Sequence, residues 1–176
     1  MDGTLEEEEI VSVVTLGRRD WQDLRAMRLE ALRSEPAAFS SSYEETLAWP
    51  DEVWWRRLAN DHMVHLLARA WSRPIGIVGG YPGADDGDDS VAEVFGMYVT
   101  KEHRGRGIGR LLLTSLIDRL SALPRIATIR LVVTETQEPA RRLYESVGFH
   151  IVGKAVEGIV VDDRRYDELI MELSVR

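Results

Sequence analysis

The sequence predicts an α/β fold in which one mixed sheet carries helices on both faces. Short runs rich in β-branched residues alternate with segments whose apolar residues recur at helical spacing, in the order β α α β β β α β α β β. The chain has 176 residues and is 44% hydrophobic, enough for one domain with a sizeable core. We therefore expect a single domain over 10–176, preceded by an acidic, flexible tail over 1–9.

The first half of the chain supplies a strand, two helices and a hairpin. Strands are predicted where β-branched residues dominate, and helices where a capping residue precedes apolar residues at helical spacing. The expected elements are a strand at 10–16, a helix capped by Asp20 and ended by Pro36, a polar loop at 37–45, a helix from Asp51 that carries Trp54 and Trp55, and strands at 63–70 and 74–81. The short connection between these two strands implies a hairpin.

The second half continues with strands and helices in alternation. A loop at 82–90, rich in Gly and Asp, leads to a strand, and Pro139 and Gly148 mark the start and the end of the last helix. The expected elements are a strand at 91–99, a helix from the glycine-rich turn toward Pro124, a strand at 128–134, a helix at 138–147 and two antiparallel strands in the remainder. Seven strands and four helices result.

Composition excludes several classes of function. The chain has no cysteine, so disulfides, thiolate metal sites and cysteine nucleophiles are excluded. The four histidines are too scattered to predict a metal site. A net charge of -8 argues against nucleic-acid binding, which needs a basic face. Without an apolar leader or a run of 18 apolar residues, we expect no membrane segment and a cytoplasmic protein.

A basic, glycine-rich turn stands out in this acidic chain. Residues 101–110, "KEHRGRGIGR", contain four lysine or arginine residues, one acid and three glycines, and they lie between a strand and a helix. Free backbone N–H groups and the helix dipole attract anions at a helix N-terminus, and glycine lets a phosphate approach the backbone. This turn therefore predicts a site for a polyanionic ligand.

Three phosphate-binding motifs compete for this turn. A Walker loop needs Lys followed by Ser or Thr after its last glycine, and Ile108 and Arg110 stand near those places. A dinucleotide-binding fingerprint lacks its third glycine and the acidic residue expected about 20 positions later. The pattern R-x-x-G-x-G, formed by Arg104, Gly107 and Gly109, fits.

With this pattern the sequence resembles the GCN5-related N-acetyltransferase (GNAT) superfamily, whose members transfer an acetyl group from acetyl-coenzyme A to an amine. "MYVTKEHRGRGIGRLLL" resembles the family's strand, pyrophosphate loop and helix. "TETQEPARRLYESVGF" resembles its second signature, which ends in L-Y-x-x-x-G-F. The resemblance covers residues 10–173 and implies a mostly antiparallel sheet of about seven strands and about four helices, splayed between the fourth and fifth strands.

The resemblance also implies a binding site for acetyl-CoA. Main-chain groups of the fourth strand would pair with the pantetheine arm, and N–H groups of the turn would hold the pyrophosphate. The residues implied are Met97, Tyr98, Val99, Arg104, Gly105, Arg106, Gly107, Ile108, Gly109, Arg110, Gln137 and Tyr144. Gly96 is a candidate β-bulge for the splay, and the alternative is a small residue that makes room for a core neighbour.

Two residues are candidates for proton transfer. In the family, the tyrosine of the second signature protonates the leaving thiolate, which assigns that role to Tyr144, although its helical spacing also fits a core tyrosine. Glu93 is the candidate base that neutralises the amine, because it lies on the fourth strand on the same side as Val99 unless a bulge intervenes. The alternative for Glu93 is an exposed strand carboxylate.

Two departures from the family's signatures and the charge of one loop bear on the identity of the acceptor. Val132 stands where the ribosomal-protein acetylating branch often has glutamate, and Gln137 stands where many members have Asn. The acidic loop at 85–89 suggests a cationic acceptor through electrostatic steering. One ring of the pair Trp54 and Trp55 is expected in the core and the other in the acceptor cleft.

We therefore expect an acetyl-CoA-dependent N-acetyltransferase that acts by direct transfer on a small-molecule or peptide amine, without a metal. The alternatives are an acetyl-CoA-binding sensor without turnover and a protein N-terminal or lysine acetyltransferase. A homodimer is possible, but no apolar stripe in the sequence predicts one.

Overall fold

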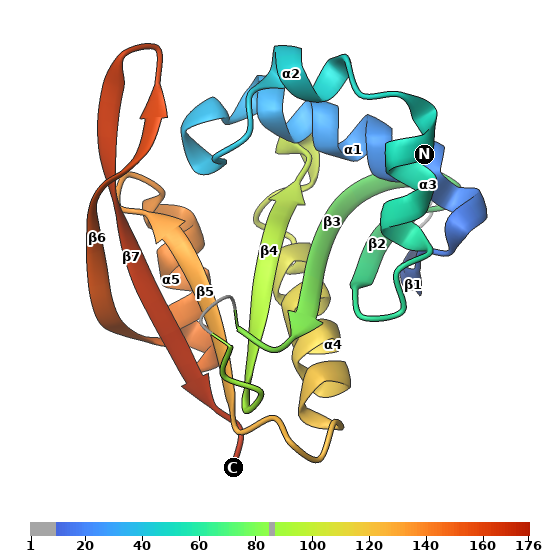
Figure 1. Cartoon of the computed structure of the whole chain (residues 1–176). Coiled ribbons are helices and arrows are strands. Elements are labelled where there is room, and N and C mark those ends of the chain that lie inside the picture. Colours follow the sequence, from blue (N-terminus) through green and yellow to red (C-terminus); the bar gives the residue numbers. More distant parts are fainter. Residues whose placement is uncertain (1–9, 85–86) are drawn as a thin grey trace, which may run out of the picture.

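A computed structural model describes residues 10–84 and 87–176, which form one seven-stranded sheet with helices on both faces (Figure 1). The strands are β1 (Val11–Thr15), β2 (Val64–Ala70), β3 (Arg73–Pro82), β4 (Val91–Val99), β5 (Thr128–Thr134), β6 (His150–Val161) and β7 (Arg164–Ser174). The helices are α1 (Trp21–Ser34), α2 (Tyr43–Leu47), α3 (Asp51–Leu58), α4 (Ile108–Ser121) and α5 (Glu138–Val147), with short 3-10 turns at Arg18–Asp20, Pro36–Ala38 and Lys101–His103. The acidic tail expected over 1–9 lies outside the described residues.

The strands follow one another in the order β1-β2-β3-β4-β5-β7-β6. Every neighbouring pair is antiparallel except β4 and β5, which run parallel. The expected hairpin joins β2 to β3, and a longer hairpin joins β6 to β7 and projects past the sheet (Figure 1). The mixed, mostly antiparallel sheet predicted from the sequence is confirmed.

β4 and β5 pair over only part of their length. The pairing begins with Val91 opposite Thr128 and ends with Val94 opposite Leu131. Beyond that point the strands diverge toward the end of the sheet that α1 and α2 cover (Figure 1). The predicted splay between the fourth and fifth strands is confirmed, and it leaves one edge of the remainder of β4 without a strand partner among the described residues.

A β-bulge lies in β4 where the splay begins. Ile77 of β3 pairs with Tyr98, but Gly79 pairs with Phe95, so two residues of β4 oppose one residue of β3. Gly96 lies inside the bulge with φ = +65°, a left-handed conformation that glycine adopts without strain. The predicted bulge is therefore present, and it reverses the alternation of side chains along β4.

Two apolar cores hold the helices to the sheet. The larger core lies between the sheet and helices α4 and α5, and its buried α4 residues are Ile108, Leu112, Leu113, Leu116 and Leu120. The smaller core packs α1 and α3 on the opposite face and includes Leu24, Met27, Ala31, Trp54, Leu67, Ile77 and Tyr98. Among the described helices, none is long and apolar enough to cross a membrane.

Two local predictions were wrong. The segment predicted as a polar loop contains α2, because the side chain of Ser42 accepts a hydrogen bond from the N–H of Glu45 at 3.1 Å and caps the helix. A serine followed three residues later by glutamate is a known helix start, so the sequence did carry this signal. Asp20 does occupy the N-cap position of α1, but the expected capping by its side chain is wrong, because its carboxylate accepts the N–H of Gly17 at 2.8 Å instead.

Candidate active site

A cavity of about 720 Å³ lies where β4 and β5 separate. Its walls come from the free end of β4, the glycine-rich turn, the start of α4, the facing residues of β5 and the start of α5. It includes almost all residues expected to bind the coenzyme: Met97, Tyr98, Val99, Arg104, Gly105, Gly107, Ile108, Gly109, Arg110, Gln137 and Tyr144. Arg106 and Glu93 do not line it.

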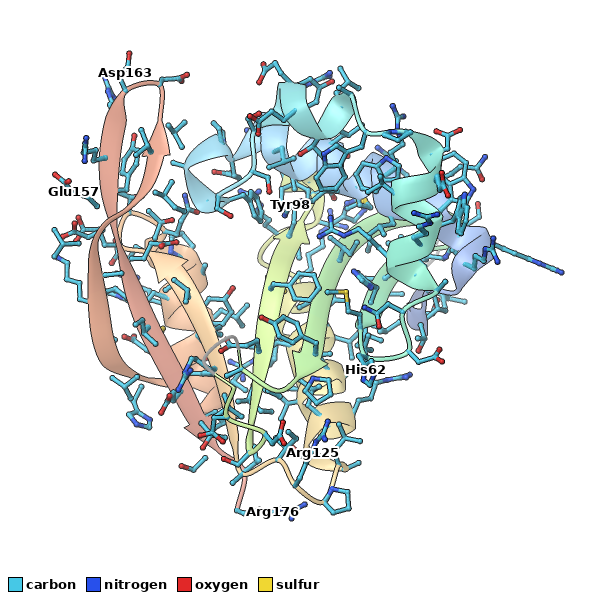
Figure 2. All side chains as sticks on the ribbon, viewed as in Figure 1. His62, Tyr98, Arg125, Glu157, Asp163 and Arg176 are labelled. Carbon is cyan, nitrogen blue, oxygen red and sulfur yellow. The ribbon has the colours of Figure 1, made fainter. Side chains whose placement is uncertain are left out.

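The free edge of β4 presents main-chain groups to this cavity. The N–H of Thr100 donates to the carbonyl of Ile75 at 2.9 Å, so Thr100 is directed toward β3. Because main-chain groups alternate between the two edges of a strand, those of Met97 and Val99 are directed toward the cavity. Those of Tyr98 are directed toward β3, and its hydroxyl donates to Glu30 at 3.1 Å, beneath the α1 layer (Figure 2).

The three glycines of the turn serve different purposes. Gly105 and Gly107 have φ = +73° and +80°, and a Cβ built on either would meet nothing within 4 Å. They therefore supply left-handed turns beside open space. A Cβ on Gly109 would lie 3.0 Å from Cδ2 of Leu143, so this glycine permits the close packing of α4 against α5.

The first turn of α4 has N–H donors that the helix does not use. The N–H of Leu111 makes the first bond of the helix, to the carbonyl of Gly107 at 2.9 Å. The N–H groups of Ile108, Gly109 and Arg110 precede it and have no acceptor within the helix. A cradle of glycine backbone at the N-terminus of a 14-residue helix fits a diphosphate.

The arginines of the turn are held in distinct ways. Arg104 donates from Nε to the carbonyl of Val99 at 2.9 Å and from Nη1 to Glu35 at 3.0 Å, so its side chain links the turn to β4 and to the end of α1. Arg110 donates to the hydroxyl of Ser146 at 2.8 Å, a neutral partner, and no carboxylate of the described residues pairs with it. The turn therefore keeps positive charge beside the helix N-terminus.

Tyr144 faces the cavity from α5 and is buried, with 6% of its surface exposed. Its ring packs edge-on against Phe149 at 6.1 Å between centroids. Burial raises the pKa of the Tyr144 hydroxyl, so the group stays protonated throughout the neutral range and remains a hydrogen-bond donor. Tyr144 is thus a core residue, as its helical spacing indicates, and it also lines the cavity, while its role as a proton donor stays a prediction.

Glu93 lies on the other face of the sheet from Val99. Val94 and Val99 contribute to the core beside α4, whereas Phe95 and Tyr98 face the α1 side, because the bulge reverses the alternation. Glu93 shares the face of Phe95, and its carboxylate lies 3.5 Å from the guanidinium of Arg130. Glu93 and Val99 were expected to share a face unless a bulge intervened, and the bulge at Gly96 does place them on opposite faces.

The second signature contains two arginines, but neither adds positive charge to the wall of the cavity. Gln137 lines the cavity at the start of α5, together with Thr136. Arg141 pairs with Glu145, and Arg142 pairs with Glu138, each four residues away on the same helix. Neither arginine lines the cavity, so the pair forms a solvated helix face rather than a phosphate contact.

Several lining residues were not anticipated from the sequence. The 3-10 turn after α1 contributes Ala38 and Phe39, and β5 contributes Leu131, Val132 and Val133. The β5 residues belong to an apolar strand in the sequence, but only the splay exposes one edge of that strand to a ligand. No local signal marks the turn at residues 36–38 as part of a cavity wall.

The rings of the tryptophan pair also separate. Trp54 is fully buried in the core beside α1, and Trp55 lies half-exposed under the guanidinium of Arg18, 4.0 Å from its ring centroid. Trp55 does not line the large cavity. The expectation that one ring is in the core is met by Trp54, but Trp55 is covered by an arginine on the surface instead of facing a cleft.

Comparisons with known proteins agree with this geometry. A sequence profile of the acetyltransferase (GNAT) family matches residues 6–149. A GNAT-family acetyltransferase from Streptococcus pneumoniae superposes with a TM-score of 0.79 at 20% identity, covering 95% of this chain and 100% of that chain. Arabidopsis thaliana NAA60, solved in complex with acetyl-CoA, superposes with a TM-score of 0.72 at 16% identity, covering 94% and 98%.

Among curated proteins, N-alpha-acetyltransferase RimI of Mycobacterium tuberculosis is 34% identical over 105 residues, 60% of this chain and 63% of that protein. The [ribosomal protein bS18]-alanine N-acetyltransferase of Escherichia coli is 34% identical over 84 residues, 48% of this chain and 56% of that protein. The chain thus spans less than two thirds of the curated relatives that it matches. With the family profile matched over most of its length, the chain belongs to the acetyltransferase (GNAT) family.

Proposed function

We propose that this protein is an acetyl-CoA-dependent N-acetyltransferase that moves the acetyl group directly to the primary amine of a small molecule or peptide. One observation carries the proposal: the free edge of β4, the glycine cradle of α4 and the buried Tyr144 all line a single cavity. Membership of the GNAT family and relatives named as N-acetyltransferases support it.

The residues present fit acetyl-CoA. The N–H groups from Gly105 to Arg110, including that of Arg106, form the cradle for the pyrophosphate, and the open space at Gly105 and Gly107 admits it. The outward main-chain groups of Met97 and Val99 offer the pantetheine amides an added-strand partner. Arg104 holds the turn in place, and Gln137 lies at the opposite wall of the cavity.

Acetyl-CoA supplies an acyl thioester, and the protein residues supply donors and a proton path. The amide of Val99 would donate a hydrogen bond to the thioester carbonyl and so stabilise negative charge on its oxygen. The Tyr144 hydroxyl is the donor for the leaving sulfur. Glu93 is the proposed acceptor of the amine proton, reached through water from the other face of β4.

Titration calorimetry with acetyl-CoA tests the binding half of this proposal. Wild-type protein is expected to bind, and Gly107→Glu is expected to lose binding because its carboxylate repels the pyrophosphate. Gly83→Glu is the matched control, since Gly83 also has a positive φ of +91° and open space but lies outside the cavity. Equal binding by all three proteins would overturn the assignment of the cradle.

Amine-dependent release of free CoA thiol tests the catalytic half. A panel of amino acids, polyamines and short peptides is expected to contain at least one acceptor. Acetyl-CoA binding without thiol release from any amine would overturn the enzymatic assignment and favour the sensor. A cytoplasmic location, a homodimer and the choice between small-molecule and peptide acceptor remain predictions.

A further inference from the structure

A second, small pocket lies on the α1 side of the bulge in β4. Its volume is about 50 Å³, room for a small polar group and little more. It shares the lining residues Phe95 and Gly96 with the large cavity, so the two spaces lie next to each other at the bulge. The remaining lining residues are Leu24, Arg28, Trp54, Arg57, His65, Ile77 and Gly79.

Two arginines line this pocket, and no acidic residue does. Within residues 10–84 and 87–176, no carboxylate forms an ion pair with Arg28 or Arg57. Arg28 lies over the ring of Phe39 at 4.7 Å and donates to the hydroxyl of Ser41 at 3.4 Å. Arg57 lies over the ring of Trp49 at 4.9 Å. Both guanidinium groups are thus held by neutral partners.

This arrangement disfavours the two positive charges. Burial and the nearby charge of Arg57 lower the pKa of Arg28 to about 10, and burial lowers the pKa of Arg57 as well. The guanidinium of Arg28 lies beside the bulge, since its Nη1 would be 3.8 Å from a Cβ built on Gly96. Uncompensated, half-buried cations at a cavity are typical of an anion site.

Two further groups in the same pocket lack partners. Trp54 is fully buried, and its Nε1 has no hydrogen-bond partner among the described residues. His65 is 4% exposed, and its Nδ1 also has none within the described part of the chain. An indole N–H can only donate, and a buried donor left unpaired costs free energy. Such a donor beside two arginines fits an acceptor-only ligand.

We propose that the pocket lined by Arg28, Trp54 and Arg57 binds a carboxylate of the acceptor, so that the preferred substrate is an amine that also carries a carboxylate, such as a free amino acid. This proposal rests on the proposed acetyl transfer. Arginine binds carboxylates through two parallel hydrogen bonds, and a carboxylate fits the small volume. Because Phe95 and Gly96 line both the pocket and the cavity, a carboxylate in the pocket would lie beside the cavity proposed to hold the thioester.

The proposal replaces the cationic acceptor suggested by the acidic loop at 85–89. Residues 85 and 86 of that loop lie outside the described residues, and Asp88 is occupied by hydrogen bonds to Ser90 at 2.7 and 2.8 Å. Steering by net charge is long-ranged and weakly specific. Two arginines that have no carboxylate partner in the described part of the chain discriminate between ligands inside a pocket much more strongly.

The direct test is a binding measurement that needs no turnover. The protein is labelled with ¹⁵N, saturated with CoA and titrated with N-acetylglycine, the acetylated product of a minimal amino acid, or with N-acetylglycinamide. The indole N–H signal of Trp54, assigned by its absence in Trp54→Phe, is the reporter. N-acetylglycine is expected to shift this signal. At equal concentration, N-acetylglycinamide is expected to cause a shift at least tenfold smaller.

Variants test whether the two arginines of the pocket are needed for this shift. Arg28→Gln and Arg57→Gln are expected to abolish the shift, whereas Arg56→Gln is expected to retain it. Arg56 neighbours Arg57 on α3 but is exposed and pairs with Glu52. An equal response to acid and amide, a response retained in Arg28→Gln, or no response to millimolar N-acetylglycine would overturn the carboxylate site.

Thiol release distinguishes this failure from failure of the proposed function. An amino acid is expected to be acetylated at least tenfold better in kcat/KM than its α-carboxamide, and Arg28→Gln is expected to remove that preference without changing the affinity for acetyl-CoA. Turnover with equal preference for acid and amide would overturn the carboxylate site and leave the acetyltransferase assignment intact. Absence of acetyl-CoA binding would overturn the assignment itself.

Discussion

Arg104 and Val99 are joined across the start of the glycine-rich turn: Nε of Arg104 donates to the carbonyl oxygen of Val99 at 2.9 Å. The same guanidinium pairs with Glu35 at the end of α1, 3.0 Å away. One side chain thereby fixes the distance between the free edge of β4, the phosphate cradle and the helical layer above them. The first arginine of the R-x-x-G-x-G motif thus has a positioning role in addition to its charge.

Arg104→Ala is expected to weaken acetyl-CoA binding about tenfold, because a charge-assisted hydrogen bond contributes roughly 1.5–3 kcal/mol and its loss frees the turn. Titration calorimetry measures the change. Glu35→Gln is the control, since it removes the ion pair but leaves the bond from Arg104 to Val99, and we expect a smaller loss. Unchanged affinity in Arg104→Ala would show that the turn is held without this bond.

Tyr144→Phe removes one oxygen and keeps the ring that packs on Phe149. We expect kcat for thiol release to fall by about 10² or more, the lower end of the range for a lost proton donor, with the Kd for acetyl-CoA within about twofold of wild type. Because burial raises the pKa of Tyr144, its ionisation should cause no loss of kcat up to about pH 10. If the variant keeps the wild-type kcat, Tyr144 is not the proton donor and serves only as a core residue.

Glu93→Gln tests the proposed base through pH. At pH 7 most of an α-amino acceptor is protonated, and we expect kcat/KM to fall by about 10–100-fold without the carboxylate. With a short peptide as the acceptor, whose α-amine has a pKa of about 7.7–8.0, the amine is already mostly neutral near pH 9, so the difference from wild type should shrink.

Glu172→Gln is the matched control for Glu93, because Glu172 also pairs with Arg130, at 2.9 Å. A loss shared equally by both variants and independent of pH would mean that Glu93 acts only in the ion-pair network around Arg130.

His65 makes the stability of the fold sensitive to acid. Burial and the nearby charge of Arg57 lower the pKa of His65 from 6.5 to about 4. Between these values the unfolded chain binds a proton that the folded chain does not, so stability falls as pH decreases from 6.5 toward 4. As the pH approaches 4, the loss in the free energy of unfolding caused by His65 approaches about 3 kcal/mol, since each unit of pKa is worth about 1.36 kcal/mol.

Urea unfolding at pH 7 and pH 4.5 measures this loss. His65→Asn is expected to lose less of its free energy of unfolding between the two pH values than wild type does. His62→Asn is the control, because His62 is exposed, and its loss should equal that of wild type. An identical pH dependence in all three proteins would contradict the lowered pKa.

The elements that carry the coenzyme site follow from local patterns in the sequence. The glycine-rich turn, the strand before it and the second signature each lie within short segments. The splay and the bulge at Gly96 were expected only through the family resemblance that these segments carry. The helix α2 was missed although Ser42 and Glu45 signal it, because the polar run around them favours a loop. The face of β4 on which Glu93 lies, relative to Val99, depended on the bulge, since one inserted residue reverses every side chain beyond it.

The carboxylate pocket has no counterpart in any local pattern. Arg28, Arg57 and His65 come from α1, α3 and β2, and each alone resembles an ordinary surface or core residue. Nothing in the sequence shows that their usual partners are missing. Only the packing of three elements against the bulge brings them together.

The sequence by itself determined the family, the glycine-rich turn and the order of the elements apart from α2, because glycine conformation, helix ends and strand periodicity act over a few residues. The tertiary structure alone decided which residues share a cavity, where Glu93 points and which charges lack a partner. Those properties depend on side chains that are distant in the chain and meet only when the sheet and its helices are packed, because burial and electrostatic pairing are set by neighbours in space.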